Sequence, residues 1–142
     1  MPIEPDPVRP ADERTDAREQ AIMLLYEAEQ RSVSPLELLE DRGLASEDLA
    51  LALLRGVENA RQVIDSLIIE HAKGWALDRM PALDRAVLRL AIHELNDRPE
   101  VPTAVIIDEA VELAKRFSTD DSGRFVNGVL ASVARKVRPA GQ

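Results

Sequence analysis

Residues 108–130 read DEAVELAKRFSTDDSGRFVNGVL, and this stretch decides the fold. Apolar residues in its first half recur at three- and four-residue spacing, which predicts an amphipathic helix from about Pro102 to Phe117. The polar run STDDSG follows and predicts a turn. The helical spacing then resumes, so a last helix is expected to begin at Phe125 or Val126.

The rest of the chain shows the same period. It predicts a helix over about 15–31, a short helix capped by Ser34, a long helix from Ser46 towards Gly74, and a helix over about 81–96. Gly56 lies inside the long helix, where glycine is unfavourable, and this indicates close packing against another helix. Because no window alternates with the period of a strand, we predict an all-α domain of six or seven helices.

The expected organisation is one helical domain between two tails. Four of the nine prolines fall within the first ten residues, so residues 1–14 are predicted to be a flexible, proline-rich acidic tail. The helical domain is expected over 15–138, with an N-terminal half to about residue 74 and a C-terminal half from about residue 75. Residues 139–142 are expected to be a second tail.

Length and composition exclude several classes of protein. The chain has 142 residues, 45% of them hydrophobic and 31% charged, which is typical of a single globular domain. It contains no cysteine, so disulfides and thiolate metal sites are excluded. No run approaches the ~18 apolar residues of a membrane span, and the N-terminus lacks a signal-peptide pattern, so we expect a cytoplasmic protein without membrane contact.

A search for catalytic chemistry finds none. The only histidines, His71 and His93, are not spaced to bind one metal ion, and no glycine-rich phosphate loop is present. Acidic pairs such as Asp108 and Glu112 lie on one predicted helix face, but they are as expected by chance among 26 acidic residues. We therefore predict no enzyme activity, no metal site and no cofactor.

Three segments together resemble the bacterial transcription antitermination factor NusB: AIMLLYEAE in the first predicted helix, PALDRAVLRLAIHEL, and VPTAVIIDEAVELAKRFSTDDSGRFVNGVL. The resemblance covers residues 18–137 and is strongest over 108–130, where two helices and a turn of fixed length match together. It implies an all-helical fold of two small subdomains and a non-enzymatic adaptor. Such an adaptor binds boxA-type single-stranded RNA of nascent ribosomal transcripts together with the ribosomal protein NusE, within the RNA polymerase antitermination complex.

The resemblance also implies which residues bind the RNA. Phe125 would stack on a base, and Arg124 would contact phosphate. Asp121, Ser122 and Asn127 would shape or contact the base edges. Periodicity alone leaves other roles open, because Phe125 is also suited to anchor the last helix in the core and Asn127 to bridge two helices.

For the protein partner, the contact face of the family matches Tyr26 and Asp84. Periodicity also allows Tyr26 to be a core aromatic residue with its hydroxyl group at the surface. We expect a monomer or a weak homodimer.

One stretch departs from the family pattern. Members commonly have an arginine-rich arm before the first helix, whereas residues 11–20, ADERTDAREQ, contain four acids and only Arg14 and Arg18. The net charge of the whole chain is −8, although residues 115–142 hold six basic and two acidic side chains. Phosphate contacts set much of the affinity for nucleic acid, so this arm predicts weak RNA binding by the chain alone.

Two alternatives to an RNA-binding adaptor remain. One, supported by the acidic arm, is a protein of the same fold that binds a protein partner and no RNA. The other is a truncated or split relative of the NusB-like domain that precedes some RNA cytosine methyltransferases. That alternative needs a separate catalytic partner, because this chain has no glycine-rich cofactor loop.

Overall fold

The computed structural model describes residues 9–42 and 48–139, and within them it contains helices and no strand. This confirms the all-α prediction. The α-helices are α1 (Arg9–Arg31), α2 (Pro35–Asp41), α3 (Asp48–Asn59), α4 (Arg61–His71), α5 (Ala82–Asp97), α6 (Thr103–Phe117) and α7 (Asp120–Val137), and a 3₁₀-helix, η1, spans Leu77–Arg79.

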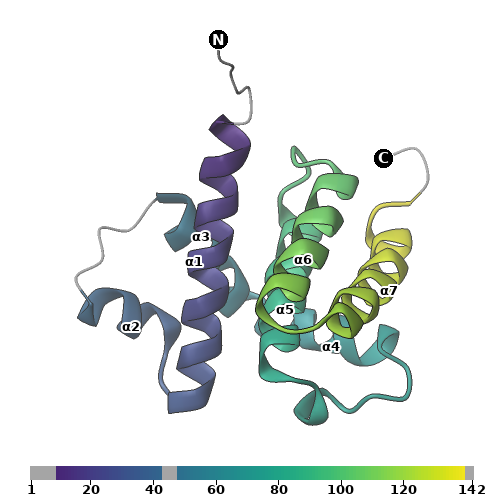
Figure 1. The fold of residues 1–142 in the computed structure, drawn as a ribbon, viewed down its shortest axis with the longest axis horizontal. Helices are drawn as coiled ribbons and strands as arrows, with labels where there is room; N and C mark the ends of the chain where they lie inside the picture. Colours follow the sequence, from purple (N-terminus) through teal and green to yellow (C-terminus); the bar gives the residue numbers. More distant parts are fainter. Residues whose placement is uncertain (1–8, 43–47, 140–142) are drawn as a thin grey trace.

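Helix α5 lies at the centre of the molecule. It packs against α1 and α3 on one side and against α6 and α7 on the other, while α4 runs below it (Figure 1). Residues 86–95 of α5 are all buried, because a helix with neighbours all round has no solvent face. Three of these buried residues, Arg89, His93 and Glu94, are polar and therefore need partners.

Glu94 finds its partner on α1. The Nε of Arg18 donates to Glu94 Oε2 at 2.7 Å, and Arg18 Nη2 donates to Oε1 at 2.9 Å. Both side chains are buried, and Glu109 of α6 adds a second carboxylate 3.6 Å from the guanidinium. Burial works against the charge of Arg18, but its hydrogen bonds and attraction to Glu94 outweigh burial and raise its pKa. This pair joins α1 to the centre of the fold.

Arg89, five residues earlier in α5, binds two other helices. Its Nε donates to Asp65 of α4 at 2.8 Å, and its Nη1 donates to Glu29 of α1 at 3.1 Å. Those hydrogen bonds and the attraction of the two carboxylates raise the pKa of Arg89 against the opposing effect of burial. Charged residues of α5 therefore fix the positions of α1 and α4.

The close helix packing expected at Gly56 is confirmed. Gly56 lies in α3, and a Cβ atom built there would overlap the imidazole ring of His93 in α5. Burial lowers the pKa of His93, and Asp97 offsets part of that effect. The absence of a side chain at Gly56 is what allows α3 to approach α5 at this point.

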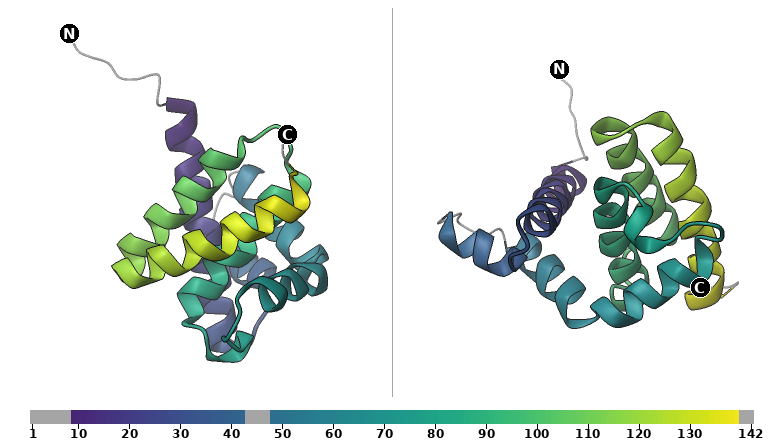
Figure 2. Two further views of the ribbon diagram at one scale, coloured as in Figure 1. Left: turned by 90° about the vertical axis from the view of Figure 1, so that its right-hand side faces the viewer. Right: turned by 90° about the horizontal axis from the view of Figure 1, so that it is seen from below.

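The long helix predicted from Ser46 to Gly74 is wrong, since α3 and α4 are separate helices that meet at Ala60. Ala60 has φ −114° and ψ 20°, outside the helical region. In the right-hand view of Figure 2, the two helices follow one another along one side of α5, from the α1 side to the α7 side. A straight helix could not follow this curved surface, so the chain bends although its apolar period continues. Ser46 itself lies outside the described residues.

Two helix starts also differ from the prediction. Helix α1 begins at Arg9, six residues before the predicted Thr15, and α7 begins at Asp120 instead of near Phe125. The residues DDSG therefore form the first turn of α7. The predicted cap of the short helix is confirmed, because the Oγ of Ser34 accepts a hydrogen bond from the backbone N–H of Leu36 at 3.2 Å.

The packing at Gly56 yields a stability prediction. Gly56→Ala forces a methyl group against His93, and overpacking of this kind typically costs about 1–3 kcal/mol. Gly128→Ala is the matched control, because a Cβ on this helical glycine meets nothing within 4 Å. The control is expected to stabilise the protein by about 0.5–1 kcal/mol. Urea unfolding measures both variants, and equal effects would contradict the packing described here.

Candidate nucleic-acid interface

The residues that the family resemblance assigns to RNA binding lie in the first two turns of α7. Thr119 caps this helix, since its Oγ1 accepts a hydrogen bond from the backbone N–H of Ser122 at 3.0 Å. Asp120 and Asp121 follow the cap, where the helix dipole favours negative charge. The segment expected to be a turn is thus helical, and its side chains point to both sides of α7.

Ser122 is buried and connects α7 to α5. Its Oγ lies 3.2 Å from Asp84 Oδ2 and 2.9 Å from the Oγ of Ser118. A hydroxyl group has one hydrogen, so Ser122 donates to one of these oxygens at a time. Ser122 therefore fixes the start of α7 against the core and has little surface for direct contact with RNA.

Asp84 is buried, against our expectation of an exposed contact for a protein partner. Only 3% of its surface is accessible, and its Oδ1 has no hydrogen-bond donor among the described residues. Burial raises the pKa of Asp84, and the hydrogen bond from Ser122 opposes this shift. Its place in the first turn of α5 offsets part of the cost of a buried carboxylate.

Phe125 is half-buried beside a tryptophan that the sequence reasoning missed. The rings of Trp75 and Phe125 have their centroids 5.6 Å apart and are tilted by 58°. With Pro81, Asp84 and Ser122 they line a hollow of about 170 Å³. The available signal was a tryptophan in the segment between two predicted helices, GWALDRMP, where no helix face required an aromatic residue.

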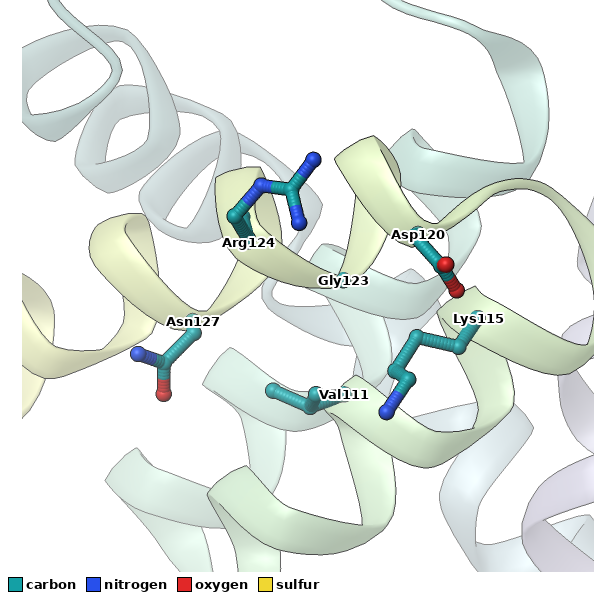
Figure 3. Close-up of a pocket in the computed structure, with 6 residues that line it drawn as sticks. All are labelled: Val111, Lys115, Asp120, Gly123, Arg124 and Asn127. Carbon is teal, nitrogen blue, oxygen red and sulfur yellow. The ribbon is translucent and has the colours of Figure 1, made fainter.

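The other side of the same turns of α7 carries basic and polar side chains, with Asp120 at the start of the helix beside them. Here Arg124 and Asn127 from α7 and Lys115 from α6 line a second hollow of about 320 Å³ (Figure 3). Arg124 and Asn127 are exposed, and Arg124 makes an ion pair with Asp121. Lys115 is exposed and has no carboxylate partner within residues 9–42 and 48–139. From the sequence, Lys115 was considered only as part of the net charge of residues 115–142.

Most other basic residues near the C-terminus are occupied. Arg116 pairs with Glu19 at 2.7 Å, and Lys136 pairs with Glu70 at 2.8 Å. Arg138 donates to backbone carbonyl groups at the end of α5, including that of Leu95 at 3.0 Å. Arg138 is therefore used for structure, whereas Arg116 and Lys136 stay half-exposed in surface ion pairs and Arg135 is exposed.

Of the two arginines of the N-terminal arm, one is exposed and the other is bound inside the fold. Arg14 is exposed on α1, whereas Arg18 is 5% exposed and bound to Glu94. Only the first can reach an RNA phosphate without breaking a buried ion pair. Tyr26, on the same helix, is half-buried and packs against the core, with part of its surface open.

The arrangement of these helices matches a known family along most of the chain. The model of the NusB family matches residues 15–135. The chain belongs to the NusB family. The transcription antitermination protein NusB of Saccharopolyspora erythraea is 53% identical over 128 residues, which span 85% of this chain and 86% of that protein.

Solved NusB structures have the same fold. NusB of T. maritima superposes with a TM-score of 0.81 at 35% identity, covering 89% of this chain and 93% of that one. A chain from a complex of NusB and NusE with double-stranded RNA superposes with a TM-score of 0.76 at 28% identity, covering 87% and 96%. Members of this family are transcription antitermination factors, and this chain is accordingly a non-enzymatic adaptor.

Two further findings concern the part of the chain that the structure describes. It contains no cluster of three or more histidine and acidic side chains suited to hold a metal ion. None of its helices is long and apolar enough to cross a membrane.

The role of Arg18 in the fold is open to a direct test. Arg18→Met leaves Glu94 buried without its cation, which typically costs about 3–5 kcal/mol. Arg14→Met removes an exposed arginine from the same helix and is expected to change stability by less than about 0.5 kcal/mol. Urea unfolding compares the two variants. Arg18→Met combined with Glu94→Leu should recover much of the loss, and equal stability of the two single variants would contradict a structural role.

Asp84 predicts a pH-dependent stability. Its pKa is raised above the ordinary value of 3.8, so the folded chain holds this proton more tightly than the unfolded chain does. Stability contributed by Asp84 is therefore present at low pH and is lost as the pH rises through the raised pKa. Asp84→Asn should melt at a higher temperature than the wild type at pH 7, and the difference should shrink towards pH 4.

Asp108→Asn is the control for this measurement, because Asp108 is an exposed carboxylate of α6. It is expected to change stability little at either pH. A lower melting temperature of Asp84→Asn at pH 7 would contradict this prediction and show that the folded chain stabilises the charged form of Asp84.

Proposed function

We propose that this chain is a transcription antitermination adaptor that binds RNA with the first two turns of α7 and acts together with a NusE protein. Family membership supports the adaptor role, and a relative has been solved with NusE and RNA. The main support for the RNA site is that α7 presents suitable side chains on two of its sides. Arg124 and Asn127 are on one side, and Phe125 is on the other. As a factor that acts on nascent bacterial transcripts, it would work in the cytoplasm.

The proposed contacts divide between the two sides of α7. Arg124 and Lys115 would neutralise phosphates, and Asn127 would donate and accept hydrogen bonds at a base edge. Phe125 would stack on a base. Asp121 holds Arg124 by an ion pair, which RNA must break or share. Ser122 would act indirectly, by holding the start of α7 against α5.

For the protein partner, we keep Tyr26 on α1 as a proposed contact. Even a core role for Tyr26 leaves its hydroxyl group at the surface, and part of the residue is exposed. Asp84 is a weaker candidate, since a partner would reach its carboxylate only after a rearrangement around Ser122.

A second candidate function is a protein-binding adaptor without RNA binding of its own. The burial of Arg18 favours it, because one of the two basic residues in 11–20 is unavailable to RNA. Under this reading NusE would supply the RNA contacts. The two functions differ in whether substitutions on α7 change RNA affinity.

Fluorescence anisotropy with a labelled boxA-type RNA, with and without NusE and at two salt concentrations, separates them. The chain alone is expected to bind weakly and with a shallow salt dependence, because few phosphates are neutralised. NusE is expected to raise the affinity. Tight binding by the chain alone would contradict the inference from the arm.

Arg124→Ala is the decisive variant for the α7 site. It should weaken RNA binding by the complex and reduce the slope of log affinity against log salt by about 0.7, the value for one lost phosphate contact on a single strand. Arg55→Ala, which removes an exposed arginine of α3, is the matched control and should leave both quantities unchanged. Equal behaviour of the two variants would favour the adaptor that does not bind RNA with α7.

A further inference from the structure

Trp75 is exposed in an unusual way. It is the only tryptophan of the chain and is 51% exposed, yet its ring contacts that of Phe125. Large aromatic residues dominate cores and interfaces, and a half-exposed one at the edge of a hollow is typical of a binding site.

The backbone before Trp75 is shaped to hold it there. Gly74 has φ +84°, a left-handed conformation that residues with side chains rarely adopt. The backbone N–H of Trp75 then donates to the carbonyl of Ala72 at 3.1 Å. The chain thus turns sharply at the end of α4 and places the indole against α7, about fifty residues further along the sequence.

The hollow beside Trp75 combines apolar walls with a small polar set. Trp75, Phe125 and Pro81 supply the walls, and Thr119, Asp121, Ser122 and Asp84 supply the polar groups. Asp84 is almost fully buried, and its Oδ1 has no donor in the described part of the chain. Pockets for small aromatic ligands have this composition, with few polar groups that fix orientation.

We propose that this hollow takes one unpaired base of the RNA and that Trp75 is a second stacking residue beside Phe125. The proposal rests on the proposed RNA-binding function and extends it from α7 to the segment after α4. The two rings already contact one another at 5.6 Å, so a base does not insert between them. It stacks on the open face of Trp75, with an edge towards the polar groups of the hollow.

Position favours an RNA base as the occupant, and the carboxylates of Asp84 and Asp121 that line the hollow can accept hydrogen bonds from a base edge. The hollow is continuous with the proposed RNA site, because Phe125, Ser122 and Asp121 line it and Arg124 is their direct neighbour. Arg124 lines the neighbouring hollow on the other side of α7 and is exposed, so it can hold the phosphate of an adjoining nucleotide. A base in a duplex keeps both faces stacked, so the pocket requires a single-stranded nucleotide.

The sole tryptophan makes the test specific. A single-stranded boxA-type RNA added to the full chain should quench the intrinsic fluorescence of Trp75, whereas the same strand annealed to its complement should not. In anisotropy with NusE present, Trp75→Ala should weaken binding of the single strand by about 5- to 150-fold, the range for one stacked base. Trp75→Phe should retain most of the affinity.

Ile69→Ala is the matched control, because Ile69 is an equally exposed apolar residue of α4 that lies outside the hollow. It should bind RNA as the wild type does. Melting temperatures of all variants confirm that each is folded, and Trp75→Ala is expected to fold because half of its side chain is exposed.

Three results would overturn the pocket. The first is RNA binding by the complex with no loss in Trp75→Ala and no quenching, which leaves the proposed function intact. The second is equal quenching by the single strand and the duplex. The third is loss of NusE binding in Trp75→Ala, together with normal RNA binding by Arg124→Ala. That result would assign the hollow to the protein partner. Absence of RNA binding by the wild-type complex would instead refute the proposed function itself.

Discussion

The buried ion pair between Arg18 and Glu94 is the contact on which the arrangement of the helices depends. Residues 86–95 of α5 have no solvent face, so any charge among them requires a partner from a surrounding helix. Arg18 donates two hydrogen bonds to Glu94, and Glu109 of α6 lies beside the same guanidinium. Thr15 adds a bond to Glu109 at 2.7 Å. These contacts fix the positions of α1, α5 and α6 relative to one another.

The use of cations inside the fold also affects the charge of the surface. A chain of net charge −8 has few cations, and several of them hold the fold together. Arg89 joins α4 and α1 to α5, and Arg138 satisfies backbone carbonyl groups at the end of α5. Cations bound in this way do not contribute to phosphate binding, because releasing them would leave buried acceptors unpaired. At the start of α7, Arg124 and the neighbouring Lys115 of α6 remain exposed.

The core and the proposed RNA site are connected through one small polar network. Asp84 of α5 contacts Ser122, and Ser122 lies between the residues of α7 that point to the two hollows. The start of α7 is also fixed from the α6 side, because a side chain at Gly123 would collide with Lys115. Arg124 and Phe125 are therefore displayed from a rigid helix end, which lowers the entropy cost of ordering them on a ligand.

The sequence by itself determined the helical class, most helix positions and the family, because periodic apolar spacing and the run 108–130 are local properties of the chain. It also indicated the close approach at Gly56. It did not reveal the bend at Ala60, since the apolar period continues through it and only the curved surface of α5 and its neighbours requires the break. Burial of Asp84 and Arg18 was hidden for a related reason. A charged residue is expected at the surface unless a partner far away in the sequence compensates it, and those partners lie 38 and 76 residues away. Likewise Trp75 meets Phe125 only because packing of α4 and α7 against α5 brings the ends of two distant helices together, and this contact between remote segments was decided by the tertiary structure alone.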